Sequence, residues 1–259
     1  MTGDLMENNT APAVSIVIPV HNAEQYIEQT VRSVEAQTEQ DFELLLVEDG
    51  SNDASAQILK KLAAEDVRIR VLVNGEPHGA CHARNCGIRE AKGRYLAFLD
   101  ADDLWLPEKL AKSLAYMKEK DGAFVFTAYE FGDREANGTG KIVHVPEHLT
   151  YRQALPRTVI FTSTVVFDLT RLRKEQIYMP EITSEDTATW WNILRSGVTA
   201  YGLDENLVTY RRAGKSLSSN KLEAIRRIWI LYRKNEKLGI LPSLYYLCGW
   251  AVRAVARRL

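Results

Sequence analysis

The first hundred residues alternate between short apolar runs and longer amphipathic segments. Four apolar runs predict buried strands at 14–20, 42–47, 69–73 and 95–99. The segments between them have apolar residues at helical spacing, from Asn22 as a possible N-cap to about Gln37, after Asp53, and across 80–91. Strand and helix in alternation are typical of right-handed crossovers, so we predict an α/β fold with a mainly parallel sheet and flanking helices.

The second half has a less regular pattern. A helix is expected to open at 105–109, with Pro107 in its first turn. Strands are expected at 124–131 and 159–167, separated by a flexible loop at 132–140. A further helix should begin at 184–186, and two short strands should follow. These two strands are expected at 200–203 and 207–210, and a helical tail is expected from Lys221 onward.

The length suits one large domain or a domain with an extension. The 259 residues are 46% hydrophobic with a net charge of −1, so the charge balance does not suggest a nucleic-acid partner. The three cysteines, Cys81, Cys86 and Cys248, lack zinc-site spacing and are expected to be free thiols in a reducing cytosol. Residues 1–12 are expected to be a flexible tail rather than a signal peptide, and no segment has the apolar run of a spanning helix.

The most informative run is Asp100-Ala101-Asp102-Asp103, directly after the fourth predicted strand. Carboxylates at a buried strand end repel each other and lose hydration. Mg²⁺ or Mn²⁺ would offset that cost, and both ions favour one or two carboxylates together with diphosphate oxygens. A solvated acidic turn that caps the next helix explains the same residues, so the run alone leaves both interpretations open.

Two other polar segments follow predicted strands. They are residues 19–22 and 48–53, and in a parallel sheet ligands bind beyond the carboxyl ends of the strands. We therefore expect these segments to converge with the acidic run at one edge of the sheet.

At this point the chain resembles the inverting, GT-A-type family 2 glycosyltransferases of bacteria, and more narrowly the teichuronic-acid and other surface-polysaccharide transferases. The resemblance is carried by four motifs in order and by the later Glu185-Asp186. The motifs are VSIVIPVHN at 14–22, VEDGSND at 47–53, ARNCGI at 83–88 and GRYLAFLDADD at 93–103.

The resemblance implies a UDP-linked sugar donor and Mn²⁺ or Mg²⁺ as cofactor. It makes 13–110 the donor-binding half, 111–220 the acceptor-binding half and 221–259 a basic aromatic helical tail. Asp102 matches the metal ligand, and Asp100 a ligand near the ribose or the metal. The residues that match donor contacts are Pro19, His21, Asn22, Asp49, Arg84, Asp100, Ala101 and Arg211.

Three of these donor contacts have a plainer alternative. Asp49 matches the residue that bonds the uracil ring, but it could belong to a turn and helix cap. His21 replaces a stacking aromatic, and it could instead be a hydrogen-bonded loop residue. Glu48 stands where the family usually has a second aspartate, and its longer side chain makes it a doubtful contact. Arg84 suits phosphate, although it could be a surface residue of its helix.

Inverting transfer needs a base that takes the proton of the acceptor hydroxyl. Asp186 matches that base and Glu185 is the fallback, while Ser184 as N-cap with acidic residues in the first turn is the structural alternative. One of Trp190 and Trp191 could stack on an acceptor sugar, the other being core. Asp103 is expected to cap the Pro107 helix, and His78 and His82 are expected to be solvated rather than metal-binding. The resemblance implies that Arg211, Arg212 and Lys215 form a basic loop that closes over the diphosphate, and a solvated basic loop is the alternative.

The tail from 221 to 259 holds nine basic and two acidic residues, with five interleaved Trp and Tyr residues. This mixture suits an anionic membrane surface. Packing of the tail on the core, or a dimer interface, is the alternative. We expect a cytoplasmic enzyme, peripheral at the inner membrane face, that moves a sugar from a UDP donor to a glycan or lipid-linked acceptor. A non-catalytic nucleotide-sugar-binding subunit and a sugar nucleotidyltransferase are the alternative functions.

Overall fold

A computed structural model describes residues 11–75, 77–212 and 221–256. The predicted tail at 1–12 and Lys215 lie wholly or largely outside these ranges. The strands form one sheet in the order β3-β2-β1-β4-β9-β6-β10-β5, with β7 beside β6 and β8 beside β10. The strands are β1 (Val14–Val20), β2 (Phe42–Glu48), β3 (Ile69–Val73), β4 (Tyr95–Phe98), β5 (Leu104–Trp105), β6 (Phe124–Gly132), β7 (Gly138–Val143), β8 (His148–Leu149), β9 (Val166–Asp168) and β10 (Ala200–Arg211).

The predicted α/β fold is confirmed. Strands β1 to β4 run parallel to one another, and β9 runs antiparallel to both β4 and β6. Strand β10 is parallel to β6. Strands β1, β2, β4, β6 and β10 therefore all end at the same edge of the sheet, and the sheet is continuous across the expected boundary between 110 and 111.

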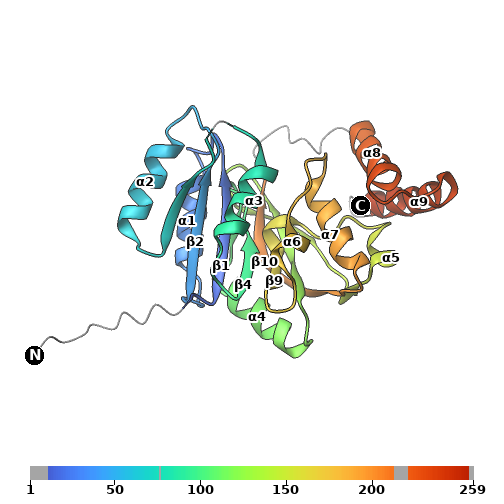
Figure 1. Cartoon of the computed structure of the whole chain (residues 1–259), viewed down its shortest axis with the longest axis horizontal. Coiled ribbons are helices and arrows are strands. Elements are labelled where there is room, and N and C mark those ends of the chain that lie inside the picture. Colours follow the sequence, from blue (N-terminus) through green and yellow to red (C-terminus); the bar gives the residue numbers. More distant parts are fainter. Residues whose placement is uncertain (1–10, 76, 213–220, 257–259) are drawn as a thin grey trace, which may run out of the picture.

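Helices cover both faces of the sheet (Figure 1). Alternation along β1 sends Ile16 and Ile18 into one apolar cluster and Val17 into the other, because successive strand side chains point to opposite faces. The longer helices are α1 (Ile27–Glu35), α2 (Ser55–Glu65), α3 (Ala80–Glu90), α4 (Lys109–Glu119), α7 (Glu185–Arg195), α8 (Lys221–Ile230) and α9 (Ile240–Ala256). Short ones are α5 (Tyr151–Ala154), η1 (Thr162–Thr164), α6 (Lys174–Ile177) and the π-helical turn η3 (Leu231–Asn235).

Helix α3 lies unusually close to the sheet. A Cβ atom on Gly87 would lie 2.3 Å from Cγ1 of Val17 on β1, so only glycine permits this approach. Arg84, one turn earlier on the same helix, is buried as a result.

Four local predictions are wrong. Asn22 has a φ of 50° and does not cap α1, which begins at Ile27 with Tyr26 at the N-cap position. The loop at 132–140 is largely a hairpin from β6 into β7. The expected strand at 159–167 is the 3₁₀ turn η1 followed by the short strand β9, and the two strands at 200–210 are one irregular strand, β10.

The C-terminal helices pack on the core through one face. Tyr232 is fully buried, and its ring stacks on Trp191 with centroids 5.4 Å apart. Its hydroxyl donates to the backbone oxygen of Leu155 at 2.7 Å. Glu236 accepts from Arg195 at 2.9 Å. The packing alternative for the tail is therefore confirmed for this face of the described residues.

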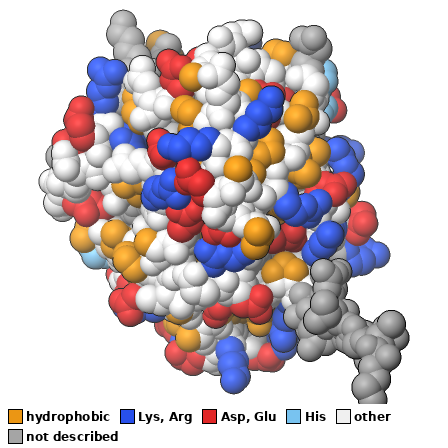
Figure 2. All heavy atoms as spheres, turned by 90° about the vertical axis from the view of Figure 1, so that its left-hand side faces the viewer, with side chains coloured by type: hydrophobic (Ala, Val, Ile, Leu, Met, Phe, Trp, Pro, Cys, Tyr) orange, Lys and Arg blue, Asp and Glu red, His pale blue; other side chains and the backbone are white. Residues whose placement is uncertain are grey.

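Surface charge is mixed at the α2 end of the sheet. Figure 2 shows acidic and basic side chains interspersed on this face. Arg32 and Lys61, on α1 and α2, both pair with Glu28 and Glu65 of the same two helices. No described helix is long and apolar enough to cross a bilayer.

Candidate active site

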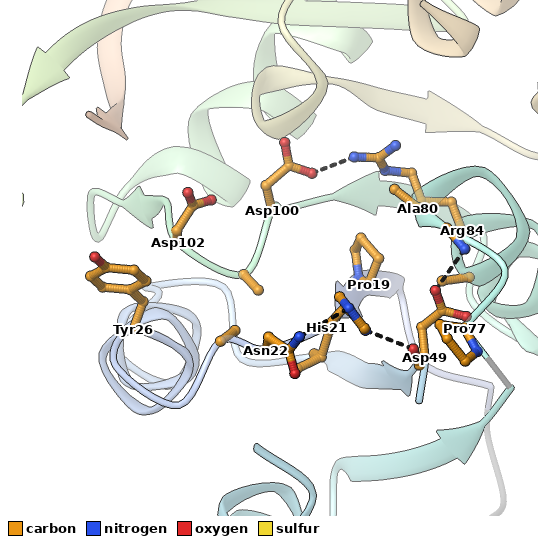
Figure 3. A pocket seen from close by; sticks show the side chains of 15 residues that line it. Pro19, His21, Asn22, Tyr26, Asp49, Pro77, Ala80, Arg84, Asp100 and Asp102 are labelled. Carbon is orange, nitrogen blue, oxygen red and sulfur yellow. Dashed lines mark hydrogen bonds and ion pairs between the residues drawn. The ribbon is translucent and has the colours of Figure 1, made fainter. Parts of the chain in front are cut away.

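A pocket of about 490 Å³ opens at the carboxyl ends of β1, β2 and β4 (Figure 3). Its walls come from the turns after these strands and from the start of α3. The convergence predicted from the three polar strand ends is therefore confirmed. The lining includes every predicted donor or metal residue except Arg211, namely Pro19, His21, Asn22, Asp49, Arg84, Asp100, Ala101 and Asp102.

One end of the pocket is built around Asp49. Its carboxylate accepts from the Asn74 side chain at 2.7 Å and from the backbone N–H groups of His78 and Gly79 at 3.1 and 2.7 Å. Burial raises the pKa of Asp49, but these hydrogen bonds outweigh burial and the net shift is downward. An ionised carboxylate has about four lone-pair sites, so Asp49 keeps room for one more donor.

His21 faces the same end of the pocket. Its Nδ1 lies 2.8 Å from the backbone oxygen of Asp49, which fixes the ring between β1 and β2 (Figure 3). Glu48 does not reach the pocket lining. Its carboxylate instead accepts from the backbone N–H groups of Gly50 and Ser51, so it shapes the turn.

The other end of the pocket is acidic. Asp100 and Asp102 are half-buried, and Figure 3 shows both on the side opposite His21 and Asn22. Asp100 accepts from Nη2 of Arg84 at 2.6 Å, whereas Asp102 forms no salt bridge within the described ranges. Burial and the neighbouring charge of Asp100 raise the pKa of Asp102. A cation at this position would relieve both effects.

These carboxylates fit a divalent ion that also has ligands from a substrate. No group of three or more His, Cys, Asp or Glu side chains in the described part of the chain could hold a metal unaided. Mg²⁺ and Mn²⁺ accept one or two carboxylates when phosphate oxygens and water complete the shell. Asp102 and the second oxygen of Asp100 supply such a set.

Asp103 is not the expected helix cap. Its side chain is fully buried and accepts from the Ser163 hydroxyl at 2.5 Å and from the Arg211 backbone N–H at 3.1 Å. Helix α4 begins after Pro107, at Lys109, without a side-chain cap. Burial raises the pKa of Asp103 well above its ordinary value. Asp103 therefore ties the acidic loop to η1 and to the end of β10.

Arg84 lies between the acidic loop and helix α7. Its Nη2 donates to Asp100, and its Nη1 donates to Oε1 of Glu185 at 3.2 Å. The neighbouring carboxylates hold its pKa above the ordinary value even though burial lowers it. The surface alternative for Arg84 is therefore wrong, and the ion pairs occupy both terminal nitrogens.

Asp186 lies next to this network on the first turn of α7. Its Oδ1 accepts from the Thr187 backbone N–H at 2.6 Å, and its Oδ2 is 3.5 Å from Oγ1 of Thr162. Burial raises the pKa of Asp186, which suits a group that must take up a proton. Ser184 has the N-cap position but a φ of 63° and no side-chain cap bond, so the capping alternative is wrong for Ser184.

Two other predictions about side chains near the base are wrong. Trp190 and Trp191 are only 2% and 1% exposed, so neither can stack on an acceptor. Arg211 belongs to the end of β10 and not to a loop. Its guanidinium donates to the backbone of Asp102 at 2.6 Å and to Gln29 at 2.6 Å, so it braces the acidic loop.

Sequence reasoning missed residues that join distant segments. The Ser163 hydroxyl accepts from the backbone N–H of Asp100 at 3.1 Å while it donates to Asp103. Tyr26 lines the pocket, and Arg211 lies over its ring at 4.7 Å. These residues belong to no motif. His82 lies 3.4 Å from Glu181, and the expectation of a solvated rather than metal-binding His78 and His82 stays a prediction.

The sheet, the pocket at its carboxyl edge and the carboxylates that follow β4 and begin α7 together define an α/β protein with a ligand site at the carboxyl ends of its strands. Residues 15–176 match the sequence profile of Glycosyl transferase family 2. The chain belongs to this family, and it is a glycosyltransferase.

Two relatives match nearly the whole chain. TuaG of Bacillus subtilis (strain 168), a glycosyltransferase assigned to teichuronic acid biosynthesis, is 42% identical over 97% of this chain and 99% of its own length. WfgD of Escherichia coli, a UDP-Glc:α-D-GlcNAc-diphosphoundecaprenol β-1,3-glucosyltransferase, is 33% identical over 94% of each chain. The resemblance to surface-polysaccharide transferases is thereby confirmed.

Two solved structures share the fold. Staphylococcus aureus TarS 1-349 in complex with UDP-GlcNAc aligns with a TM-score of 0.68 and 20% identity, covering 92% of this chain and 71% of that one. The mannosyltransferase PcManGT from Pyrobaculum calidifontis, in complex with GDP-Man and Mn²⁺, aligns with a TM-score of 0.65 and 18% identity, over 96% and 74% of the two chains. At these identities the likeness concerns the fold alone.

Proposed function

We propose that this protein transfers a sugar, with inversion, from a UDP-sugar to a glycan or lipid-linked acceptor during surface-polysaccharide synthesis. One observation carries the proposal: Arg84 connects Asp100 in the pocket to Glu185, the neighbour of Asp186. A donor site and a candidate base are thus parts of one network. The relatives support the substrate class, because WfgD is a UDP-Glc-dependent enzyme with a diphosphoundecaprenol-linked acceptor.

The donor would lie along the pocket with its uracil at Asp49 and His21. The remaining acceptor capacity of Asp49 suits a ring N–H, and the fixed His21 ring offers a flat surface to the base. The diphosphate would then reach the acidic end, where Asp100 and Asp102 would hold Mn²⁺ or Mg²⁺. When bound, that ion neutralises charge on the leaving diphosphate.

Asp186 would act as the general base. It takes the proton from the acceptor hydroxyl while that oxygen forms a bond to the anomeric carbon and the bond from this carbon to the diphosphate oxygen breaks. Attack from the face opposite the leaving group inverts the configuration. Glu185 would act through Arg84 and not on the acceptor itself, because its Oε1 already accepts from that arginine.

The two alternative functions make different demands on the chain. A sugar nucleotidyltransferase would be expected to have a Gly-rich basic loop after its first strand, whereas here His21 and Asn22 form a turn bonded to residues 49–52. A non-catalytic binding subunit would bind the donor without turnover. The raised pKa of Asp186 is favourable for a base and has no use in donor binding alone.

A second part of the proposal concerns location, at the inner face of the cell membrane in the cytoplasm. Helix α9 exposes apolar side chains that the core does not cover, with Leu241 at 80%, Tyr245 at 75% and Val252 at 69%. The tail that contains them carries an excess of seven positive charges. An amphipathic aromatic and basic surface suits anionic lipid, where a lipid-linked acceptor would be found.

A screen of nucleotide sugars tests the function. Thermal unfolding is measured with UDP-Glc, UDP-GlcNAc, UDP-Gal and GDP-Man, each with and without Mn²⁺, and UDP release is then assayed with a GlcNAc-diphospho-lipid acceptor. We expect a Mn²⁺-dependent rise in Tm with a UDP-sugar, because a ligand of the folded state stabilises it. Acceptor-dependent UDP release supports transfer, and binding without release favours the non-catalytic alternative.

A further inference from the structure

Four half-buried aromatic rings form a cluster at the ends of β6 and β10. Tyr129 and Phe131 lie on one face of β6, Tyr210 pairs with Phe131 in the strand register, and Phe161 precedes η1. The ring centroids of Phe161 and Tyr210 are 4.7 Å apart, and those of Tyr129 and Phe161 are 5.1 Å apart. We call these four residues the aromatic cluster.

The aromatic cluster lies next to both chemical parts of the candidate active site. Tyr210 precedes Arg211, whose backbone N–H donates to Asp103 at 3.1 Å in the acidic loop. Phe161 precedes Thr162, whose Oγ1 is 3.5 Å from Asp186. Because β6 and β10 end at the same sheet edge as β4, the cluster extends the site beyond the donor pocket and into the second half of the chain.

Core packing accounts in part for Tyr129 and Phe131, which both pack against the apolar core, but not for the exposure of the cluster. The core aromatics Phe124, Phe167 and Trp190 are at most 2% exposed, whereas the four rings of the aromatic cluster all keep contact with solvent. Aromatic rings that stay partly exposed beside the candidate active site offer flat apolar surfaces to a ligand.

Phe161 and Tyr210 are better placed to receive a ligand than Phe131. The Phe131 ring already has the Arg212 guanidinium over one face, 3.8 Å from its centroid. Phe161 and Tyr210 stand nearly edge to face, at 63°. Phe161 and Tyr210 together form an angled apolar wall between the acidic loop and Thr162, whose hydroxyl lies beside Asp186.

We propose, resting on the function proposed above, that Phe161 and Tyr210 form the subsite for the acceptor sugar. A pyranose whose C–H groups gather on one face would lie against this wall with a hydroxyl directed to Asp186. Stacking on the rings orients the nucleophile, and the Asp186 carboxylate takes its proton as the new C–O bond forms. This wall takes the role that Trp190 and Trp191, buried in the core, cannot have.

Saturation-transfer NMR tests the subsite without requiring turnover. The probes are the methyl glycosides of glucose, galactose, N-acetylglucosamine and N-acetylgalactosamine, in the presence of UDP and Mn²⁺. We expect saturation of the ring protons of at least one sugar by the wild-type protein, and a several-fold loss in Phe161→Leu and Tyr210→Leu. Tyr210→Phe should keep the signal, because it keeps the ring. Tyr95→Leu is the matched control and should also keep the signal, because Tyr95 is a half-buried tyrosine at the start of β4, at the opposite edge of the sheet.

Two results would overturn the subsite. One is the absence of saturation transfer from the wild-type protein to all four sugars. The other is an undiminished signal in both leucine variants when thermal unfolding shows them folded. UDP binding, measured by calorimetry on the same samples, separates this failure from failure of the proposed function: a wild-type protein that binds no UDP contradicts the function, whereas normal UDP binding without sugar contact contradicts only the subsite. With an active acceptor, the leucine variants should raise the acceptor KM about tenfold and leave the donor KM within twofold.

Discussion

Arg84 and Asp100 form an ion pair in which Nη2 of the arginine donates to Oδ1 of the aspartate at 2.6 Å. The arginine is 7% exposed in its side chain, and its other terminal nitrogen reaches Glu185 on α7. The Arg84 guanidinium therefore joins the loop after β4 to α7, the helix of the candidate base. Asp100 in that loop and Asp186 on that helix are 86 positions apart in the chain.

Arg84→Met should destabilise the fold and abolish transfer. Removal of one partner from a buried ion pair leaves uncompensated charge and costs about 3–5 kcal/mol in the free energy of unfolding. Urea denaturation measures the loss. Arg32→Met removes an exposed arginine that is paired with three glutamates, and it should change stability by less than about 1 kcal/mol. Equal effects of the two substitutions would contradict the bridging role of Arg84.

Asp102→Asn should remove the Mn²⁺ dependence of UDP binding. The substitution keeps the size of the side chain but loses the charge that a divalent ion needs. Calorimetry of UDP binding with Mn²⁺ and with EDTA measures the difference between the two conditions. Asp41→Asn, at an exposed position before β2, should bind UDP like the wild type. A fully metal-dependent Asp102→Asn variant would refute the metal assignment.

Asp186→Asn should stop transfer while UDP binding stays within about twofold of the wild type. The base must be ionised, and burial raises its pKa, so kcat/KM should fall as the pH drops through that raised value. The acidic limb should therefore lie above the ordinary aspartate pKa of about 3.9. A pH–rate profile on the wild type and UDP calorimetry on the variant check both halves. Loss of UDP binding in Asp186→Asn would show that the residue is structural.

Lys109→Met should stabilise the protein. The Lys109 ammonium is fully buried without a hydrogen-bond partner among the described residues, and burial lowers its pKa well below the ordinary value. The Trp105 ring at 3.9 Å offsets part of this cost, but a cation–π contact contributes only about 0.5–2 kcal/mol. Replacement of a buried polar group that lacks a partner should raise the free energy of unfolding by about 1–3 kcal/mol at pH 7.

The pH dependence of stability gives a second check on Lys109. Between the lowered folded-state pKa and the ordinary unfolded value of about 10.4, the unfolded chain binds the proton and the folded one does not. Stability of the wild type should therefore rise with pH in that window, and Lys109→Met should lose this rise. Lys112→Met, at an exposed lysine one turn later, is the matched control and should keep it. If Lys109→Met keeps the wild-type rise of stability with pH, Lys109 is charged in the folded protein and the prediction is wrong.

Leu241→Glu combined with Tyr245→Glu should weaken binding to anionic liposomes. Both side chains are more than 70% exposed, so the substitutions should leave the fold intact while they add negative charge and remove apolar contact. Sedimentation with phosphatidylglycerol vesicles measures the bound fraction, and neutral phosphatidylcholine vesicles report the charge dependence. Leu241→Ala is a milder variant that keeps the charge. Unchanged sedimentation of the double variant would refute the membrane surface on α9.

Much of the first half of the fold follows from local pattern. Strands β1 to β4 and the helix α3 were predicted close to their observed bounds, because continuous β-branched runs and helical spacing are local properties of the chain. The second half was predicted less well. The shortness of β9 and the irregular course of β10 depend on pairing with β4 and β6, and no local signal records that pairing.

The sequence by itself determined the family, through its four motifs and their order. It also determined the α/β class and most of the residues that line the pocket. It did so because strand ends in a parallel sheet meet at one edge, whatever the detailed packing. Only the tertiary structure decided what the charged side chains contact. Arg84 bridges two carboxylates, Arg211 braces the acidic loop and Asp103 bonds Ser163, and each contact joins segments far apart in the chain. The tertiary structure likewise buried Trp190 and Trp191 and left Phe161 and Tyr210 partly exposed, since burial depends on which helix covers which face of the sheet.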